Sequence, residues 1–446
     1  MILKRCDVDA KRRNTVSSNY KSRYLFWLCL FPLYLSCFSN GEKNSSQIVY
    51  WSANNPDEII FARAVVEQWN QLNPHFIVKF QPVPEGRSSE EIILAAVVGK
   101  TTPDIYSNMW QGDVEFYAQS GTLVPLDTIT GFLEFIYERC DSATVEEVTS
   151  ADGHIYQIPW KINPIMLLYN RNIMNKLGYY NPPSTYGEYL DAAKKFQKDA
   201  DNDGYVDRWI GYCEIMLVWY QRFFDFYPLY LAASGGGPLV KNNEVMFNND
   251  YAIETFRFLK TLYEKNYLPR ERLSARSDAF LGSEIATRFA GPWEIAHAEK
   301  FKTEGFEYSF ASMPVPDGFN GPVYTYCDPK NIVLFNTCQN PELAWKFLAH
   351  MLSKENDLEF LKITSQLPRR RSLFTDEFFA DYFKENPKMI PFAKQAQYIR
   401  GTDSSPVLKE IFDVITQEYE ACVVYGTKSP EKAIQDAADA AQLLLN

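Results

Sequence analysis

Several features that would indicate catalysis are scarce or missing in this sequence. Histidine occurs only four times, at His75, His154, His297 and His350, and none of the four lies in an HExxH or catalytic-triad signature. No CxxC motif or other metal-binding cysteine spacing occurs. The glycine triplet 235–237 follows an aromatic run and lacks the Lys-Ser/Thr of a phosphate loop. The sequence therefore offers no motif for metal-dependent, nucleotide-dependent or triad chemistry, and we expect no cofactor.

An excess of basic charge is also missing. The chain has 446 residues with 45 Lys and Arg against 56 Asp and Glu, which gives a formal net charge of -11. The first 36 residues hold seven basic and two acidic residues, so their removal changes the net charge by five, to -16. Binding to nucleic acid requires a basic face for phosphate. An acidic chain without a basic stripe therefore argues against nucleic acid as a partner.

The apolar run near the N-terminus is too short to span a bilayer. Residues 25–35 form a run of eleven after several basic residues, whereas a spanning helix needs about 20. This pattern is typical of a secretory signal peptide, which we place at residues 1–36. Residues 33–37 resemble a bacterial lipobox, although Tyr34 stands where that signal usually has leucine.

The lipobox resemblance implies a lipid anchor on Cys37 and a location in the periplasm or on the outer face of the cytoplasmic membrane. An ordinary signal peptide cleaved nearby is the alternative. Residues 37–46 are rich in Ser and Asn and indicate a flexible tether.

Aromatic residues are abundant, at 15% of the chain, with 28 Tyr, 31 Phe and 9 Trp. Much of this content is expected in the core, but an excess of Tyr and Trp also suits a site built on ring stacking. The length allows two or three domains on a prior of roughly 150 residues each.

An alternation of strands and helices is predicted after residue 46. Strands are expected at 47–51, 76–80 and 103–106, and helices follow each of them. Asn55 is placed to cap the first helix, with Pro56 at its first position. This rhythm predicts an open α/β sheet, in which ligands bind beyond the carboxyl ends of the strands. From Pro341 onward the pattern becomes mostly helical.

The stretch 152–170 predicts a crossing between two parts of the fold. It is apolar for most of its length, but Pro159 and Pro164 lack the N–H that a continuous central strand needs. We therefore predict two strands joined by a bent crossing that exposes Trp160, Lys161 and Asn163. A single kinked core strand is the alternative.

A second motif is an acidic loop at residues 199–207. Asp199, Asp201, Asp203 and Asp207 match the first positions of a calcium loop, with glycine at the sixth. The twelfth position is Ile210 in place of the usual glutamate. A structural Ca²⁺ clip and a solvated acidic turn both remain open. The cysteines at 327 and 338 could form a bridge outside the cytoplasm, but buried free thiols are favoured.

Several short segments occur together in an order that resembles the family 1 extracellular solute-binding proteins, the sugar-binding components of ABC importers. Each is weak alone, and together they span most of the chain beyond residue 46. They are Thr102–Ile105, Tyr117–Asp127, Asp152–Pro159, Leu168–Asn170, Pro182–Thr185, Asp199–Asp207, Ala290–Trp293, Ala344–Leu348 and Gln366–Arg369.

The resemblance implies a two-lobe periplasmic-binding-protein fold, with an N-terminal lobe of residues 47–157 and 288–335 and a C-terminal lobe of 158–287 and 336–446. The lobes would be joined by crossing hinge strands and would close on a sugar, and a monomer would deliver it to a membrane permease. The residues that it places in the cleft are Asn54, Asn55, Trp110, Gln111, Asp113, Trp160, Asn163, Trp219, Trp293, Tyr324 and Tyr326.

These residue types fit carbohydrate, because a pyranose has an apolar face that stacks on Trp or Tyr and a rim of hydroxyls that pairs with Asp, Asn and Gln. Three alternatives compete with a sugar binder. An exported glycoside hydrolase would need two carboxylates roughly 5–9.5 Å apart. A structural or adhesive lipoprotein would leave the aromatic residues unexplained. A binder of another small polar solute would use the same fold.

Overall fold

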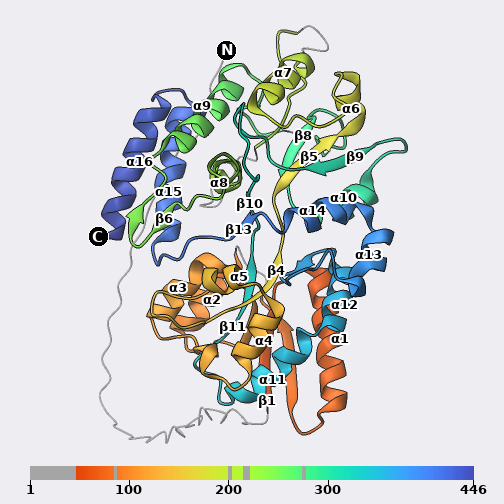
Figure 1. The fold of residues 1–446 in the computed structure, drawn as a ribbon, viewed down its shortest axis with the longest axis vertical. Helices are drawn as coiled ribbons and strands as arrows, with labels where there is room; N and C mark the ends of the chain where they lie inside the picture. The colour runs from red at the N-terminus through yellow and green to blue at the C-terminus, as the bar shows by residue number, and fades with distance from the viewer. Residues whose placement is uncertain (1–46, 85–87, 199–202, 214–220, 274–277) are drawn as a thin grey trace, which may run out of the picture. The chain divides into compact units, whose positions relative to one another are not determined.

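The computed structural model describes residues 47–84, 88–198, 203–213, 221–273 and 278–446 (Figure 1). A six-stranded mixed sheet has the order β12-β4-β11-β3-β1-β2. β1 runs parallel to β2 and β3, whereas β11 is antiparallel to β3 and β4. The strands are β1 (Gln47–Ser52), β2 (Ile77–Pro82), β3 (Ile105–Trp110), β4 (Ile158–Ile162), β11 (Lys330–Leu334) and β12 (Leu367–Pro368).

A three-stranded antiparallel sheet has the order β8-β5-β9. Its strands are β8 (Thr287–Ala290), β5 (Met166–Asn170) and β9 (Tyr308–Ala311). Two shorter pairs accompany it, β10 (Thr325–Tyr326) with β13 (Ile399–Arg400), and β6 (Val240–Lys241) with β7 (Glu244–Val245).

The predicted crossing within 152–170 is confirmed, but it lies at residues 163–165, because Pro159 to Ile162, which were expected in the crossing, belong to β4. β4 belongs to the six-stranded sheet and β5 to the three-stranded sheet, and the chain bends between them at Pro164. The bend is held by backbone bonds to a second crossing, from Asn163 N to Cys327 O (2.6 Å) and from Ile165 N to Tyr326 O (2.8 Å). The predicted exposure is wrong, because every residue from 155 to 170 is buried. The crossing is packed on all sides by the chain itself.

In the described part of the chain, seven helices accompany the six-stranded sheet. Asn55 caps the first, as predicted, by accepting from the N–H groups of Asp57 and Glu58. One apolar cluster unites β1, α1 and α4 with α11 and α12, which come from much later in the chain. The helices are α1 (Pro56–Leu72), α2 (Ser89–Val98), α3 (Gln111–Gln119), α4 (Phe132–Arg139), α5 (Ser142–Glu147), α11 (Pro341–Met351) and α12 (Lys354–Thr364), with the 3-10 turn η1 (Leu126–Thr128).

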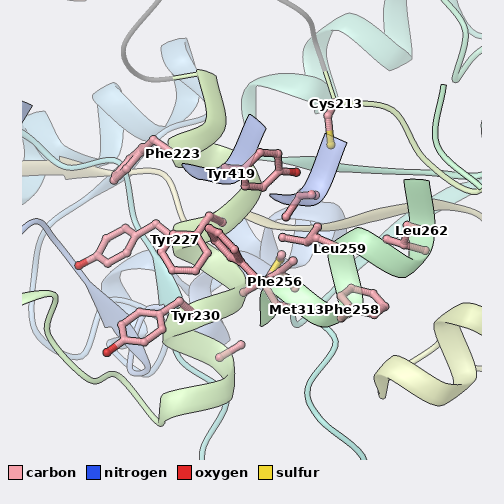
Figure 2. Close-up of a cluster of buried hydrophobic side chains, with 14 of the residues drawn as sticks. Cys213, Phe223, Tyr227, Tyr230, Phe256, Phe258, Leu259, Leu262, Met313 and Tyr419 are labelled. Carbon is pink, nitrogen blue, oxygen red and sulfur yellow. The ribbon is translucent and has the colours of Figure 1, made fainter. Parts of the chain in front are cut away.

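The other helices lie with the three-stranded sheet, around two apolar clusters. Figure 2 shows part of the larger one, in which Phe223, Tyr227 and Tyr230 of α8 pack near Phe256 and Tyr419. The helices are α6 (Arg171–Lys176), α7 (Tyr186–Phe196), α8 (Gln221–Ser234), α9 (Asp250–Glu264), α10 (Trp293–Phe301), α13 (Ala380–Glu385), α14 (Ile390–Gln395), α15 (Leu408–Tyr419) and α16 (Pro430–Leu445), with η2 (Glu377–Phe379), η3 (Pro387–Met389) and η4 (Glu420–Val424).

The expected lobe boundaries differ from the strand pairing. β4 stays in the six-stranded sheet, so the first segment reaches residue 162 and not 157. β8 and β9, expected with the N-terminal lobe, pair with β5. α11 and α12, expected with the C-terminal lobe, pack against β1 and α1. Sequence order misled here because the chain passes between the two sheets three times, near residues 163, 327 and 369.

Two further findings concern the membrane and the thiols. Among the described residues, no helix has the length and apolar character to cross a membrane. Cys140, Cys213, Cys327, Cys338 and Cys422 are buried and are not in disulfides, so the Cys327–Cys338 bridge does not form.

Candidate ligand-binding site

Polar residues cluster where α3 begins, directly after the carboxyl end of β3. α3 starts at Gln111 with no loop in between, so its first turn lies at the sheet edge where α/β proteins bind ligands. This turn meets residues 401–409, which connect β13 to α15 and include the first two residues of that helix. We name the contacts between residues 111–115 and residues 401–409 the α3 seam.

Charge pairing holds the α3 seam together. Lys409 Nζ lies 2.6 Å and 2.9 Å from the two carboxylate oxygens of Asp113. Burial raises the pKa of the Asp113 carboxyl, and the Lys409 ammonium acts against this shift. Beside this pair, Ser404 Oγ donates to Glu115 Oε2 at 2.9 Å. The seam therefore buries acidic groups together with partners that come from the distant C-terminal segment.

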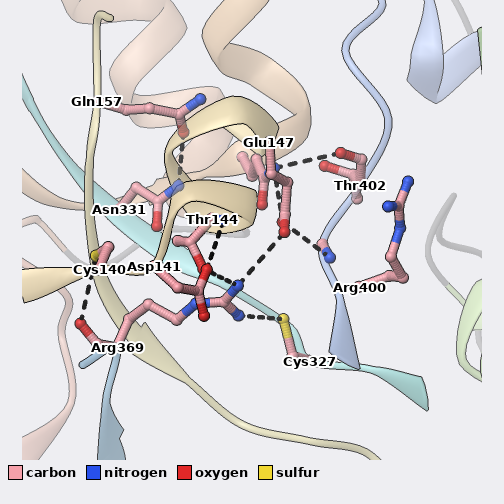
Figure 3. A network of polar contacts seen from close by, with 12 residues as sticks. Cys140, Asp141, Thr144, Glu147, Gln157, Cys327, Asn331, Arg369, Arg400 and Thr402 are labelled. Carbon is pink, nitrogen blue, oxygen red and sulfur yellow. Dashed lines mark hydrogen bonds and ion pairs between the residues drawn. The ribbon is translucent and has the colours of Figure 1, made fainter. Parts of the chain in front are cut away.

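Glu147 and Arg369 extend the α3 seam into a wider network (Figure 3). Glu147 Oε1 accepts from Gln111 Nε2 (3.2 Å) and from the N–H of Gly401 (3.0 Å), while Gln111 also donates to the Thr402 carbonyl (3.3 Å). Arg369 Nη2 donates to Thr144 Oγ1 at 2.8 Å and lies 3.4 Å from Glu147 Oε2. A single carboxylate thus joins α3, the 401–409 segment and the third crossing.

A second chain of contacts starts at Trp110, the last residue of β3. Its indole Nε1 donates to the Tyr326 hydroxyl at 3.0 Å, and that hydroxyl donates to Asp328 Oδ1 at 3.3 Å. Lys330 lies 3.5 Å from the same carboxylate. Burial raises the pKa of the Tyr326 hydroxyl, which keeps it protonated. The structure therefore brings Trp110 and Tyr326 together in the core, and their contact with a ligand stays a prediction.

Trp110, Trp160 and Trp293, which were all predicted at the site, have different environments. Trp160 is 1% exposed and packs against Phe360, with ring centroids 5.0 Å apart, in the core of the six-stranded sheet. It presents no free face, so the prediction that its ring stacks on a ligand is wrong. Trp110 is 2% exposed and belongs to a different core cluster. Trp293 begins α10 and is 42% exposed, so it retains a surface that a ligand could contact.

The other predicted contacts also fall into two groups. Asn54 and Asn55 are exposed beyond β1, and Tyr324 is partly exposed with its ring 5.7 Å from that of Tyr398. Asn163 is buried, and its amide donates to Gln366 Oε1 at 3.3 Å. Its side chain is therefore part of the crossing and does not face an open surface.

Some calls fall partly or wholly outside the described residues. Cys37, Trp219, Asp199 and Asp201 lie there. Asp203 is exposed, and its Oδ1 accepts from the N–H of Tyr205 at 2.8 Å. Within the described ranges, no group of three or more His, Cys, Asp or Glu side chains is arranged to hold a metal ion. The calcium clip therefore stays an untested prediction.

A buried polar group at the first crossing was missed by the sequence reasoning. Lys161, expected at the surface, is 3% exposed and pairs with Glu58 from the first turn of α1. Gln366 Nε2 donates to Glu58 Oε1 at 2.9 Å and so ties this pair to the third crossing. The motif Gln366–Arg369 was noted for its resemblance only. A lysine within an otherwise apolar strand was the available signal that it would need a buried partner.

Comparison with known proteins places this geometry in context. The family profile described as bacterial extracellular solute-binding protein matches residues 64–390. The crystal structure of an uncharacterized protein from Listeria monocytogenes has a TM-score of 0.78 and 27% identity, covering 90% of this chain and 100% of that one. The cyclic alpha-maltosyl-1,6-maltose binding protein of Arthrobacter globiformis has a TM-score of 0.73 and 20% identity over 90% and 98% of the two chains.

A sequence relative, the maltotriose-binding protein of Pyrococcus abyssi, is 21% identical over 379 residues, which is 83% of this chain and 76% of that protein. The structural likenesses confirm the expected α/β periplasmic-binding-protein fold with mixed sheets. The family match also decides between a binder and a hydrolase, because this family binds solutes and is not enzymatic. The chain belongs to the bacterial extracellular solute-binding protein family, as a solute-binding protein of an ABC transporter.

Proposed function

We propose that the solute is an uncharged sugar or oligosaccharide, held between two lobes built on the two sheets and delivered to a membrane permease. The observation that carries the proposal is the pairing of charge at the candidate site. Asp113 is paired with Lys409, and Asp328 with Lys330. An anionic solute would need cations that are not already neutralised. Paired charges beside aromatic rings suit a neutral ligand with many hydroxyls.

The relatives support the same ligand class. A maltotriose-binding protein, an arabinooligosaccharide-binding protein and a cyclic maltosyl-maltose binding protein are all among the similar proteins. One relative binds sn-glycerol-3-phosphate, so a phosphorylated polyol is the competing solute. That alternative is disfavoured by the paired lysines Lys330 and Lys409.

The proposed contacts follow from exposure. Trp293, Tyr324, Asn54 and Asn55 retain accessible surface, and we assign ring stacking to the two aromatic residues. Trp110, Gln111, Asp113, Asn163 and Tyr326 are buried and bonded within the chain, so we assign them to the walls that position the site. We also propose the lipid anchor at Cys37, a monomeric state and an extracytoplasmic location.

Calorimetric and thermal-shift titration tests the ligand class. The purified protein is titrated with maltotriose, arabinotriose, glucose and glycerol 3-phosphate, and the recovered ligand is analysed for cleavage. A binder stabilises the native state increasingly with the logarithm of ligand concentration above the Kd, and it returns its ligand intact. A saturable response to glycerol 3-phosphate and to none of the sugars would overturn the sugar assignment.

Trp293 offers a matched pair of variants for the site itself. Trp293→Ala should weaken sugar binding about tenfold or more, because stacking is lost together with apolar contact area. Phe301→Ala is the control, since Phe301 is another exposed aromatic residue of the same helix. Equal sugar affinity in both variants would remove Trp293 from the site.

A further inference from the structure

A cavity lined by none of the residues assigned to the sugar lies beside the network around Glu147, and Arg369 and Thr144 of that network belong to its wall. It has a volume of about 540 Å³ and is lined by α4–α5 residues Asp141 and Thr144, by the third crossing at 368–375, and by residues 393–397 at the end of α14. We name it the arginine cavity, because Arg369, Arg370 and Arg371 all line it, together with Lys394.

Three arginines in or beside the arginine cavity are paired with carboxylates. Arg370 Nε lies 2.7 Å from Asp357, and the same carboxylate accepts both Nη groups of the buried Arg139, at 2.6 Å and 3.1 Å. Two guanidinium groups therefore share one carboxylate. Arg369 is balanced by Glu147 at 3.4 Å.

Two more cations have no such balance. Arg371 and Lys394 are exposed, and neither forms an ion pair in the described part of the chain. Lys394 lies over the ring of Phe374, with Nζ 5.8 Å from its centroid. Among the described lining residues, Asp141 is the one carboxylate, so it offsets a single charge. Asp357, Asp376 and Glu355 act on Arg370, and Glu147 acts on Arg369. Arg371 and Lys394 are therefore the cations of the cavity that have no ion pair within the described residues, in a protein whose overall charge is strongly negative.

The cavity also has walls from both sheets. Arg371 is tied to the side of the six-stranded sheet, because its backbone N–H donates to the Arg139 carbonyl at 2.8 Å. Lys394 belongs to α14, where Phe392 packs on Phe310 of β9, with ring centroids 4.5 Å apart. An unfolded chain would not place these groups together, so a ligand that needs both would bind the native state only.

We propose that the arginine cavity is a second binding site, separate from the sugar site, that takes a small multivalent oxyanion such as inorganic phosphate. Guanidinium groups present a planar fork of N–H donors that matches the oxygen geometry of phosphate. At physiological salt, electrostatic interactions between exposed charges extend over only about 8 Å. A small anion in the cavity is therefore affected more by the positive charges of Arg371 and Lys394 than by the negative net charge of the whole chain.

Isothermal titration calorimetry with inorganic phosphate, at constant ionic strength set with chloride, tests the proposal. The native protein should show saturable one-to-one binding. The double variant Arg371→Gln/Lys394→Gln should bind at least tenfold more weakly while keeping the unfolding temperature of the native protein, since neither side chain has an ion pair to lose. Lys346→Gln, an exposed lysine of α11 outside the cavity, should bind phosphate as the native protein does.

Asp141→Asn supplies a change in the opposite direction. It removes the negative charge from the lining, but an asparagine can still cap α5, where Asp141 accepts from the N–H of Thr144 at 2.7 Å. Phosphate binding should therefore become several-fold tighter. Absence of a saturable signal, or equal affinity in the native protein and the double variant, would overturn the site. The sugar titration is independent of these results, so either proposal can fail without the other.

Discussion

The buried pair of Lys161 and Glu58 gives the sharpest test of how the first crossing is held. Both side chains are 3% exposed, and Gln366 donates to the same Glu58 oxygen. Burial lowers the pKa of the Lys161 ammonium, while the Glu58 carboxylate acts in the opposite direction. Lys161→Met removes the cation and leaves the carboxylate buried without its counter-charge. Breaking a buried pair in this way costs about 3–5 kcal/mol.

The double variant Glu58→Leu/Lys161→Met separates the value of the pair from the cost of breaking it. Replacement of both ions by apolar groups should cost less than the single change, because neither charge then has to be desolvated. The remaining cost is the lost acceptor of the Gln366 amide, about 1–3 kcal/mol. Urea unfolding followed by tryptophan fluorescence measures both variants, with the midpoint shifted and the slope unchanged. Lys195→Met is the control. Lys195 pairs with Asp191 at 2.6 Å, but both are about half exposed, so its loss should cost less than about 1 kcal/mol.

Two outcomes would contradict this reasoning. If Lys161→Met costs no more than the Lys195 control, the Glu58 carboxylate must reach water in the native state. If the double variant is destabilised as much as the Glu58→Leu and Lys161→Met single variants added together, the two side chains have no coupling energy, and their pairing does not hold the crossing.

Three further predictions concern other parts of the structure. Burial raises the pKa of Asp403 from 3.8 to about 6, so the folded state holds its proton more tightly than the unfolded state. Stability should then fall by about 3 kcal/mol as pH rises from about 4 to above 6. Asp403→Asn still accepts from the N–H groups of Leu239 and Val240, and its unfolding midpoint should lack this fall; a profile as steep as that of the native protein would refute the assignment. Trp160→Ala should cost about 3–5 kcal/mol in urea unfolding without changing sugar affinity, whereas a loss of affinity at full stability would restore Trp160 to the site. Tyr326→Phe removes the hydroxyl that links Trp110 to Asp328 and should cost about 1 kcal/mol, measured in the same way; an unchanged midpoint would show that the link does not stabilise the native state.

Local patterns predicted the crossing and the first helix cap correctly. Pro164 lies between β4 and β5, where the crossing was predicted, whereas Pro159 lies within β4 opposite Asn331 and does not end the strand. Asn55 caps α1, as predicted, through bonds that span only two or three residues. Such features depend on the backbone nearby, so they can be recognised from sequence.

The candidate site was harder to predict. Trp110 and Tyr326 were both expected at it and do meet, but Trp160 was also expected there and lies in the core. A tryptophan on a strand has the same local pattern whether its ring faces a ligand or another helix. Phe360, which covers Trp160, lies 200 residues further along the chain, and nothing near residue 160 indicates that contact.

The sequence by itself determined the fold class, the family and the place of the first crossing, because these follow from local periodicity, turn chemistry and the order of short motifs. Only the tertiary structure decided which segments share a sheet, which tryptophans are covered and which charges are paired. The reason is that burial and charge pairing depend on partners far away in the chain, such as Lys409 for Asp113 and Glu58 for Lys161. Those partners are brought together only when three crossings join the two sheets.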